Sequence, residues 1–246
     1  MNGTLAVLRR ELKAYFYSPL AYIVLTFILL IQGYSFSVIV AFLSDPRYPA
    51  GKPLELFFGG TIFPWLVQLF GGTFLTMRLV AEELRSGTIE TLMTAPVSET
   101  QVVLGKYFAA LVFFTFLWAP TLIYVGIIRA FTPVDWGPIA ASYLGVLGIG
   151  ALFLAVGIFA SATSKNQIVS AIASFFGLLV LFSAGLMENL ANGETAKKLF
   201  GHVNLWQHMD DFAKGIVDTR RLVYYLSVAA LFLFLTARAL EAKKWR

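Results

Sequence analysis

Apolar residues are distributed along this chain in six long runs that are separated by polar segments. A run of about 20 apolar residues is long enough to cross the hydrocarbon core of a membrane as a helix. Helices are expected there because they satisfy their own backbone hydrogen bonds. The pattern predicts an all-α membrane protein, a single membrane domain over residues 1–246, with six transmembrane helices at about 20–42, 56–77, 107–128, 139–162, 168–187 and 222–237.

Residues 1–18, before the first run, have the pattern of an amphipathic helix. Leu5, Leu8 and Leu12 recur at helical spacing, and basic residues occupy the other side. Such a helix lies in the membrane interface with its apolar face toward the lipid. The alternative is a frayed, basic terminus.

The polar segment 81–106, between the second and third runs, carries the most distinctive local pattern. From Thr88 onward, Ile89, Leu92 and Met93 fall on one narrow apolar face of a helix. Pro96 ends that helix within about two turns, because proline lacks the backbone N–H and disfavours helical geometry before it. We expect a short helix that presents these side chains to a partner. An ordinary surface helix is the alternative.

A second helix start follows that proline. Ser98 has Gln101 three residues later, which is a capping-box pattern. The pattern predicts a helix that begins there and continues directly into the third apolar run.

The other polar segments are less specific. Residues 163–167 are a short break in which Ser164, Lys165 and Asn166 form either a second, smaller docking point or a plain tight turn. Residues 188–221 mix apolar and charged positions, which predicts short amphipathic helices on the outer side. The fourth run is rich in glycine and alanine, so it is expected to be the buried helix of the bundle or a subunit contact.

Composition excludes a soluble domain. The chain is 58% hydrophobic and only 13% charged, with a mean hydropathy of +0.75. Its net charge of +5 does not indicate nucleic-acid binding, because the basic residues lie at the ends of apolar runs. An even number of spans and the excess of lysine and arginine on one side predict that both termini are cytoplasmic.

Several kinds of chemistry are missing. The six predicted span cores contain no Asp, Glu, Lys, Arg or His, which disfavours an ion-coupled transporter. The sequence has no phosphate-binding loop of the Gly-x-x-x-x-Gly-Lys-Ser/Thr type, and it has no cysteine. His202 and His208 could contribute to a metal site, but two surface histidines are the simpler interpretation. We therefore predict no catalytic residue, cofactor or metal site in this chain.

The segment 82–106 resembles the type 2 ABC exporter permeases, also called the ABC-2 family. In them a Glu-Glu-x-x-x-Gly-Thr-x-Glu-x-Leu-x-x-x-Pro-Val-Ser segment followed by Gly-Lys leads into the third span. The matching residues are Glu82, Glu83, Gly87, Thr88, Glu90, Leu92, Pro96, Val97, Ser98, Gly105 and Lys106. Within the family, the chain looks most like the short permeases that include the gliding-motility-associated subunits, partly because of the segment 210–218.

This resemblance implies a function. The segment after the second span would be the cytoplasmic coupling helix, which docks on a separate ATPase subunit that binds ATP and Mg. The docking residues would be Glu82, Glu83, Gly87, Thr88, Ile89, Glu90, Leu92, Met93 and Pro96. Glu82 and Glu83 would contact a basic patch on the ATPase or Arg85, unless they are simply solvated.

The resemblance also implies the partners and the location. The expected partners are two ATPase subunits, a second copy of this chain or a homologous permease, and a periplasmic or accessory membrane subunit. The expected location of the chain is the cell inner membrane. A non-transporting membrane anchor of an ATPase-linked envelope or motility complex is the alternative.

Overall fold

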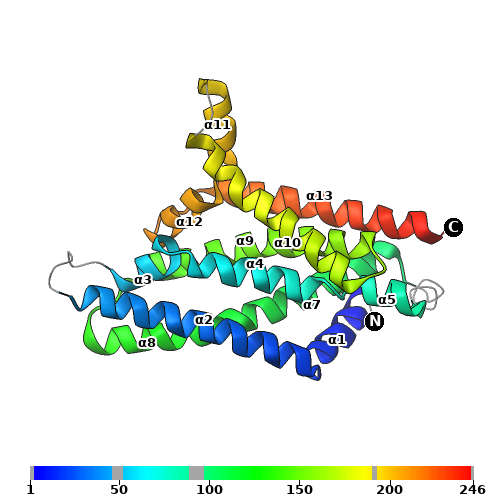
Figure 1. Ribbon diagram of the computed structural model, residues 1–246, viewed down its shortest axis with the longest axis horizontal. Helices are drawn as coiled ribbons and strands as arrows, with labels where there is room; N and C mark the ends of the chain where they lie inside the picture. The colour runs from blue at the N-terminus through cyan, green and yellow to red at the C-terminus, as the bar shows by residue number, and fades with distance from the viewer. Residues whose placement is uncertain (1–2, 46–51, 89–96, 190–192, 245–246) are drawn as a thin grey trace.

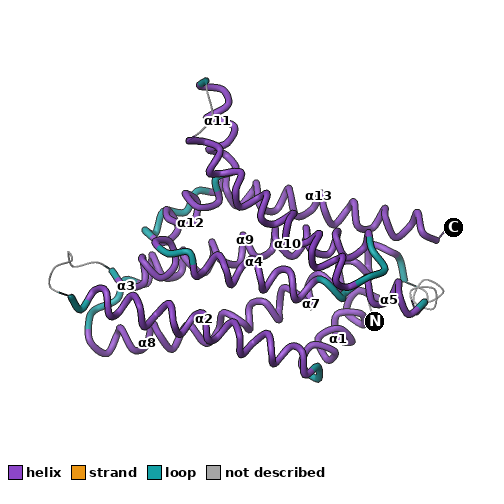
Figure 2. The backbone as a smooth tube through the Cα atoms, viewed as in Figure 1, coloured by secondary structure: helices purple, strands orange, loops and turns teal. Residues whose placement is uncertain are grey.

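Nearly all of the described chain is helical. The computed structural model describes residues 3–45, 52–88, 97–189 and 193–244, and within those ranges there is no strand (Figures 1 and 2). Five helices in these ranges are long and apolar enough to cross a membrane, and a bent helix pair would make a sixth span. The prediction of an all-α membrane protein is therefore confirmed.

The helices follow the polar and apolar pattern closely. In chain order they are α1 (Gly3–Phe16), α2 (Pro19–Leu43), α3 (Pro53–Glu55), the π-helical turn η1 (Leu56–Gly60), α4 (Phe63–Thr76), α5 (Ala81–Ser86), α7 (Glu99–Trp118), the 3₁₀ turn η2 (Ala119–Thr121), α8 (Leu122–Phe131), α9 (Trp136–Thr163), α10 (Gln167–Ala184), the 3₁₀ turn η3 (Gly185–Asn189), α11 (Glu194–Val203), α12 (Leu205–Ala213) and α13 (Thr219–Lys244).

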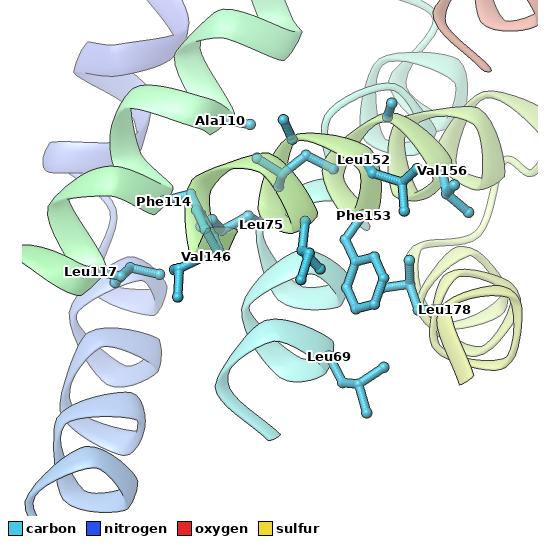
Figure 3. Packing of buried hydrophobic residues seen from close by; sticks show 14 of the residues in the cluster. Leu69, Leu75, Ala110, Phe114, Leu117, Val146, Leu152, Phe153, Val156 and Leu178 are labelled. Carbon is cyan, nitrogen blue, oxygen red and sulfur yellow. The ribbon is translucent and has the colours of Figure 1, made fainter. Parts of the chain in front are cut away.

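The fourth span, α9, is the central helix. It packs against α4, α7, α10, α12 and α13. Figure 3 shows Val146, Leu152 and Phe153 of α9 among side chains of α4, α7 and α10. At Gly150 an added Cβ would lie 2.2 Å from the Phe114 ring, so only glycine lets α7 approach this closely. The small residues of the fourth run thus serve packing within the chain.

The second span is not one straight helix, in contrast to the run predicted at 56–77. Residues Pro53–Gly60 and Phe63–Ser86 form two helical pieces that meet at 49°. Thr61 between them is extended, and Pro64 lies in the first turn of α4, where its missing N–H costs no hydrogen bond. The break therefore follows from local backbone chemistry within an apolar stretch.

A similar local change occurs in the third span. Pro120 lies in η2, between α7 and α8. Proline has no backbone N–H to donate within a continuous α-helix, and the local 3₁₀ turn lets the chain pass this position.

The segment between the fifth and sixth spans forms two short helices, as predicted. α12 buries Leu205, Met209 and Phe212 against α9 and η1. α11 projects away from the rest of the molecule (Figures 1 and 2). The two helices are therefore placed differently: α12 packs on the bundle, whereas α11 extends away from it.

Several polar elements share one end of the bundle. Figure 1 places α1, α5 and the last turns of α13 together at that end. Lys243 Nζ donates to the Ala162 carbonyl at 2.6 Å, so the end of α13 contacts the end of α9. α1 and the last turns of α13 therefore lie on the same side as α5, as an even number of spans between them requires.

Candidate functional site

The polar segment after the second span begins as a helical extension of that span. The backbone N–H groups of Val80 and Ala81 donate to the Ser161 hydroxyl at 3.1 and 3.0 Å. The first N–H groups of a helix have no partner within it, so this serine of α9 satisfies the start of α5 from outside. The contact fixes α5 to the end of α9. The sequence pattern had assigned no helix to residues 81–86.

α5 ends at Gly87, which turns the chain. Its φ of 73° lies in the left-handed region, where glycine is favoured. Ser86 Oγ and Thr88 Oγ1 are hydrogen-bonded at 2.9 Å across the turn, and Thr88 is exposed. The remaining predicted docking residues, Ile89, Glu90, Leu92, Met93 and Pro96, lie outside the described residues.

The chain re-enters the described structure just before α7. The Gln101 N–H donates to Ser98 Oγ at 3.3 Å, and the Ser98 N–H donates to Gln101 Oε1 at 3.1 Å. This is the reciprocal capping box that the sequence predicted. The helix it starts continues without interruption through the membrane-facing run to Trp118.

A buried ion cluster joins the two sides of this segment. Lys106 Nζ lies 3.0 Å from both Glu11 Oε1 and Glu83 Oε1, and it donates to the Leu79 carbonyl at 2.7 Å. Arg10 Nη2 lies 2.6 Å from the same two carboxylate oxygens. The Lys106 side chain is only 1% exposed. The cluster therefore connects α1, α5 and α7 at the end of the bundle.

The electrostatics of this cluster favour the charged form of Glu11. Burial alone would raise the pKa of Glu11, but Lys106 and Arg10 outweigh burial and hold the pKa of this carboxyl below its usual range. A buried cation would be costly if it were left alone. Here two carboxylates and a backbone carbonyl surround it, so the charge is compensated where it lies.

The cluster changes the interpretation of the adjacent acids Glu82 and Glu83, for which Arg85 was one expected partner. The ion pairs of Glu83 are with Lys106 and Arg10 rather than with Arg85. Glu82, in contrast, is exposed. The two adjacent carboxylates therefore have different surroundings, and Glu82 is the one that is accessible from outside.

Sequence reasoning missed the role of Lys106 and Glu11. Val7, Glu11 and Tyr15 follow one another at intervals of four and form the buried face of α1. A carboxylate on the apolar face of an amphipathic helix signals a buried cationic partner. That signal was present in the sequence, but only the fold identifies the partner as Lys106.

The turn between α9 and α10 is self-contained. The Asn166 N–H donates to Ser164 Oγ at 3.0 Å, and the Ile168 N–H donates to Asn166 Oδ1 at 2.9 Å. Lys165 is exposed at its tip. These contacts are those of a tight turn that also caps α10, and they leave Lys165 accessible to a partner.

The two histidines of the segment 188–221 differ from the expectation that both lie on the surface. His202 is exposed, but His208 is buried and its Nδ1 lies 3.0 Å from the Tyr225 hydroxyl. Burial, assisted by Arg221, lowers the pKa of His208 to about 4, so this imidazole is neutral at pH 7. No group of three or more metal-ligating side chains occurs in the described ranges.

Taken together, the fold and this site define a multi-pass, all-α membrane protein. Residues 54–237 match the model of the ABC-2 family transporter proteins. Because the match covers most of the chain, the protein belongs to that family and is a permease-type transmembrane subunit of an ABC transporter. No curated protein matches the chain in sequence.

Proposed function

We propose that this chain is the transmembrane subunit of an ATP-driven exporter and that a separate ATPase subunit drives it. Two copies, or this chain with a homologous permease, form the translocation path, and two ATPase subunits bind ATP and Mg. The complex lies in the cell inner membrane with both chain termini in the cytoplasm, and a periplasmic or accessory membrane subunit can join it.

One observation carries this proposal. The segment that follows Gly87 leaves from α5 and returns at α7, and both helices are fixed to the same end of the bundle. Ser161 ties α5 to α9, and Lys106 ties α7 to α5 and α1. A displacement of this segment by a partner would therefore act on several membrane helices at once. This is what a subunit without its own nucleotide-binding loop requires.

The docking face can be tested by reversing its chemistry. Leu92→Arg and Met93→Glu place a charge on the apolar face that we assign to the ATPase contact, and desolvating such a charge at an interface is unfavourable. We expect both variants to reach the membrane at normal levels but to lose the ATPase subunit on purification. Leu92→Met is the matched control and retains volume and apolarity.

Activity completes the test. The complex is reconstituted in vesicles, and ATP hydrolysis and ATP-dependent movement of candidate substrates are measured. Normal coupled activity in Leu92→Arg would rule out this docking face. ATPase binding without movement of any substrate would instead support the membrane-anchor function.

A further inference from the structure

A cavity of about 320 Å³ lies next to the ion cluster, between α1, the junction of α4 with α5, and α7. Most of the residues that line it are charged, although it lies at the end of two membrane-spanning helices. The wall residues that matter here are Arg10, Glu11, Arg78, Glu82, Glu83 and Lys106.

Most of these charges compensate one another. Arg10 and Lys106 pair with Glu11 and Glu83, so this set of four is neutral. The other two charges, Arg78 and Glu82, take part in no ion pair among the described residues. Arg78 Nη1 donates to the Ser18 hydroxyl at 3.0 Å, and its guanidinium lies 5.6 Å from the centre of the Tyr15 ring. The cavity thus has one uncompensated cation and one uncompensated anion.

A buried acceptor adds to the anionic side. Glu83 Oε1 forms ion pairs with both cations of the cluster, Arg10 and Lys106. Glu83 Oε2, in contrast, is buried and has no hydrogen-bond partner within the described part of the chain. A buried carboxylate oxygen without a partner is unfavourable. A ligand with N–H donors would supply one.

The two uncompensated charges lie in a definite order relative to the membrane. Arg78 follows the apolar helix α4 directly, and its partner Ser18 immediately precedes the first span, α2. Glu82 lies one helical turn further out, because its N–H donates to the Arg78 carbonyl at 3.2 Å. The cation is therefore nearer the hydrocarbon region, and the anion is nearer the water.

We propose that this cavity binds the headgroup of a phospholipid that carries a primary ammonium, of the phosphatidylethanolamine type. The phosphate of such a lipid lies next to its glycerol and acyl chains, where it would meet Arg78. The ammonium lies beyond the phosphate, where Glu82 and Glu83 accept its N–H donors. α2 begins beside Arg78 and exposes Leu20, Ile23 and Phe27, an apolar surface along which acyl chains can lie.

The same chemistry discriminates between headgroups. A quaternary ammonium, as in phosphatidylcholine, has no N–H to donate to a carboxylate. Phosphatidylglycerol has the phosphate but no cation. The inference needs only a membrane protein and does not depend on ATPase coupling, so its failure would leave the proposed function untouched.

The experiment is native mass spectrometry of the full chain, purified with any ATPase subunit that stays bound. The protein is released from nanodiscs that contain equal amounts of phosphatidylethanolamine, phosphatidylcholine and phosphatidylglycerol. We expect one retained phosphatidylethanolamine. Removing a charge-assisted contact in Arg78→Gln should lower its retention about tenfold. Arg9→Gln, at an exposed arginine of α1 that does not line the cavity, is the matched control and should retain the lipid.

A second pair of variants keeps the test independent of folding. Glu82 is exposed and takes part in no ion pair among the described residues, so Glu82→Gln should reduce the preference for phosphatidylethanolamine over phosphatidylcholine without loss of phosphate binding. Glu82→Lys should shift the preference to phosphatidylglycerol. Glu241→Gln, at the same end on α13, is the control.

Three results would overturn the inference. One is equal retention of all three lipids by the unaltered chain. Another is competition by soluble glycerophosphoethanolamine as strong as by the lipid itself, which would assign the cavity to a soluble headgroup. The last is loss of the lipid whenever the ATPase subunit is bound, which would make the cavity a protein-docking pocket.

Discussion

At the scale of single residues, Lys106 shows how an ammonium can be held inside an apolar bundle. Its partners come from two distant parts of the chain, Glu11 and Glu83, and a third contact comes from the Leu79 carbonyl. Pairing offsets the cost of desolvation, but removal of one partner leaves the others buried and uncompensated. The cluster is therefore balanced rather than strongly stabilising.

Lys106→Met tests this balance. It leaves the carboxylates of Glu11 and Glu83 with Arg10 alone, and we expect a loss of stability of about 3–5 kcal/mol. The double variant Lys106→Met, Glu11→Gln restores neutrality and should recover most of that loss, a clear departure from additivity. Thermal unfolding in detergent measures both, with Lys165→Met, at an exposed lysine, as the control.

If the double variant were no more stable than Lys106→Met, the ammonium would act by filling space, and charge balance would not be its role.

At the scale of elements, the close contact of α1 with α7 depends on one glycine. A Cβ added at Gly105 would lie 2.7 Å from Val7 Cβ and 2.9 Å from the Thr4 carbonyl oxygen. Neither atom is the end of a flexible side chain, so α1 itself would have to move. The predicted interfacial helix is thus also packed firmly on the third span.

Gly105→Ala should therefore loosen α1. We expect a destabilisation of about 1–3 kcal/mol, the usual cost of overpacking. Limited proteolysis of α1 and thermal unfolding measure the effect. Gly126→Ala in α8 is the matched control, because an added Cβ there meets nothing within 4 Å. Equal behaviour of the two variants would contradict the close packing of α1.

At the scale of the whole molecule, the polar elements divide between two ends of the bundle. α5, the end of α9 and the end of α13 are joined by hydrogen bonds at one end. α12 and the pocket between residues 52–55 and 132–142 lie at the start of α9. This division has the form expected of a chain that crosses a membrane repeatedly.

Single cysteines can test the sidedness, because the chain has no cysteine of its own. Thr88→Cys and Lys165→Cys should react with an impermeant maleimide only in inverted membrane vesicles. Lys214→Cys, after α12, should react only in vesicles of the native orientation. All three positions are exposed. Labelling of Thr88→Cys and Lys214→Cys from the same side would refute the three crossings that we assign between them, the third, fourth and fifth spans.

The sequence alone determined the class of the protein, the approximate positions of the helices and several of their ends. Hydrophobic run length and caps are local properties, so the apolar runs and the Ser98 capping box could be predicted from neighbouring residues. The family also followed from a local pattern, the segment 82–106.

Only the tertiary structure decided which polar groups meet. Glu11 and Lys106 are 95 positions apart, and Ser161 and Ala81 are 80 apart. No local rule specifies such pairs, because they form only when α1, α5, α7 and α9 pack together. The burial of His208 against Tyr225 depends in the same way on a contact that a hydrophobic pattern does not contain.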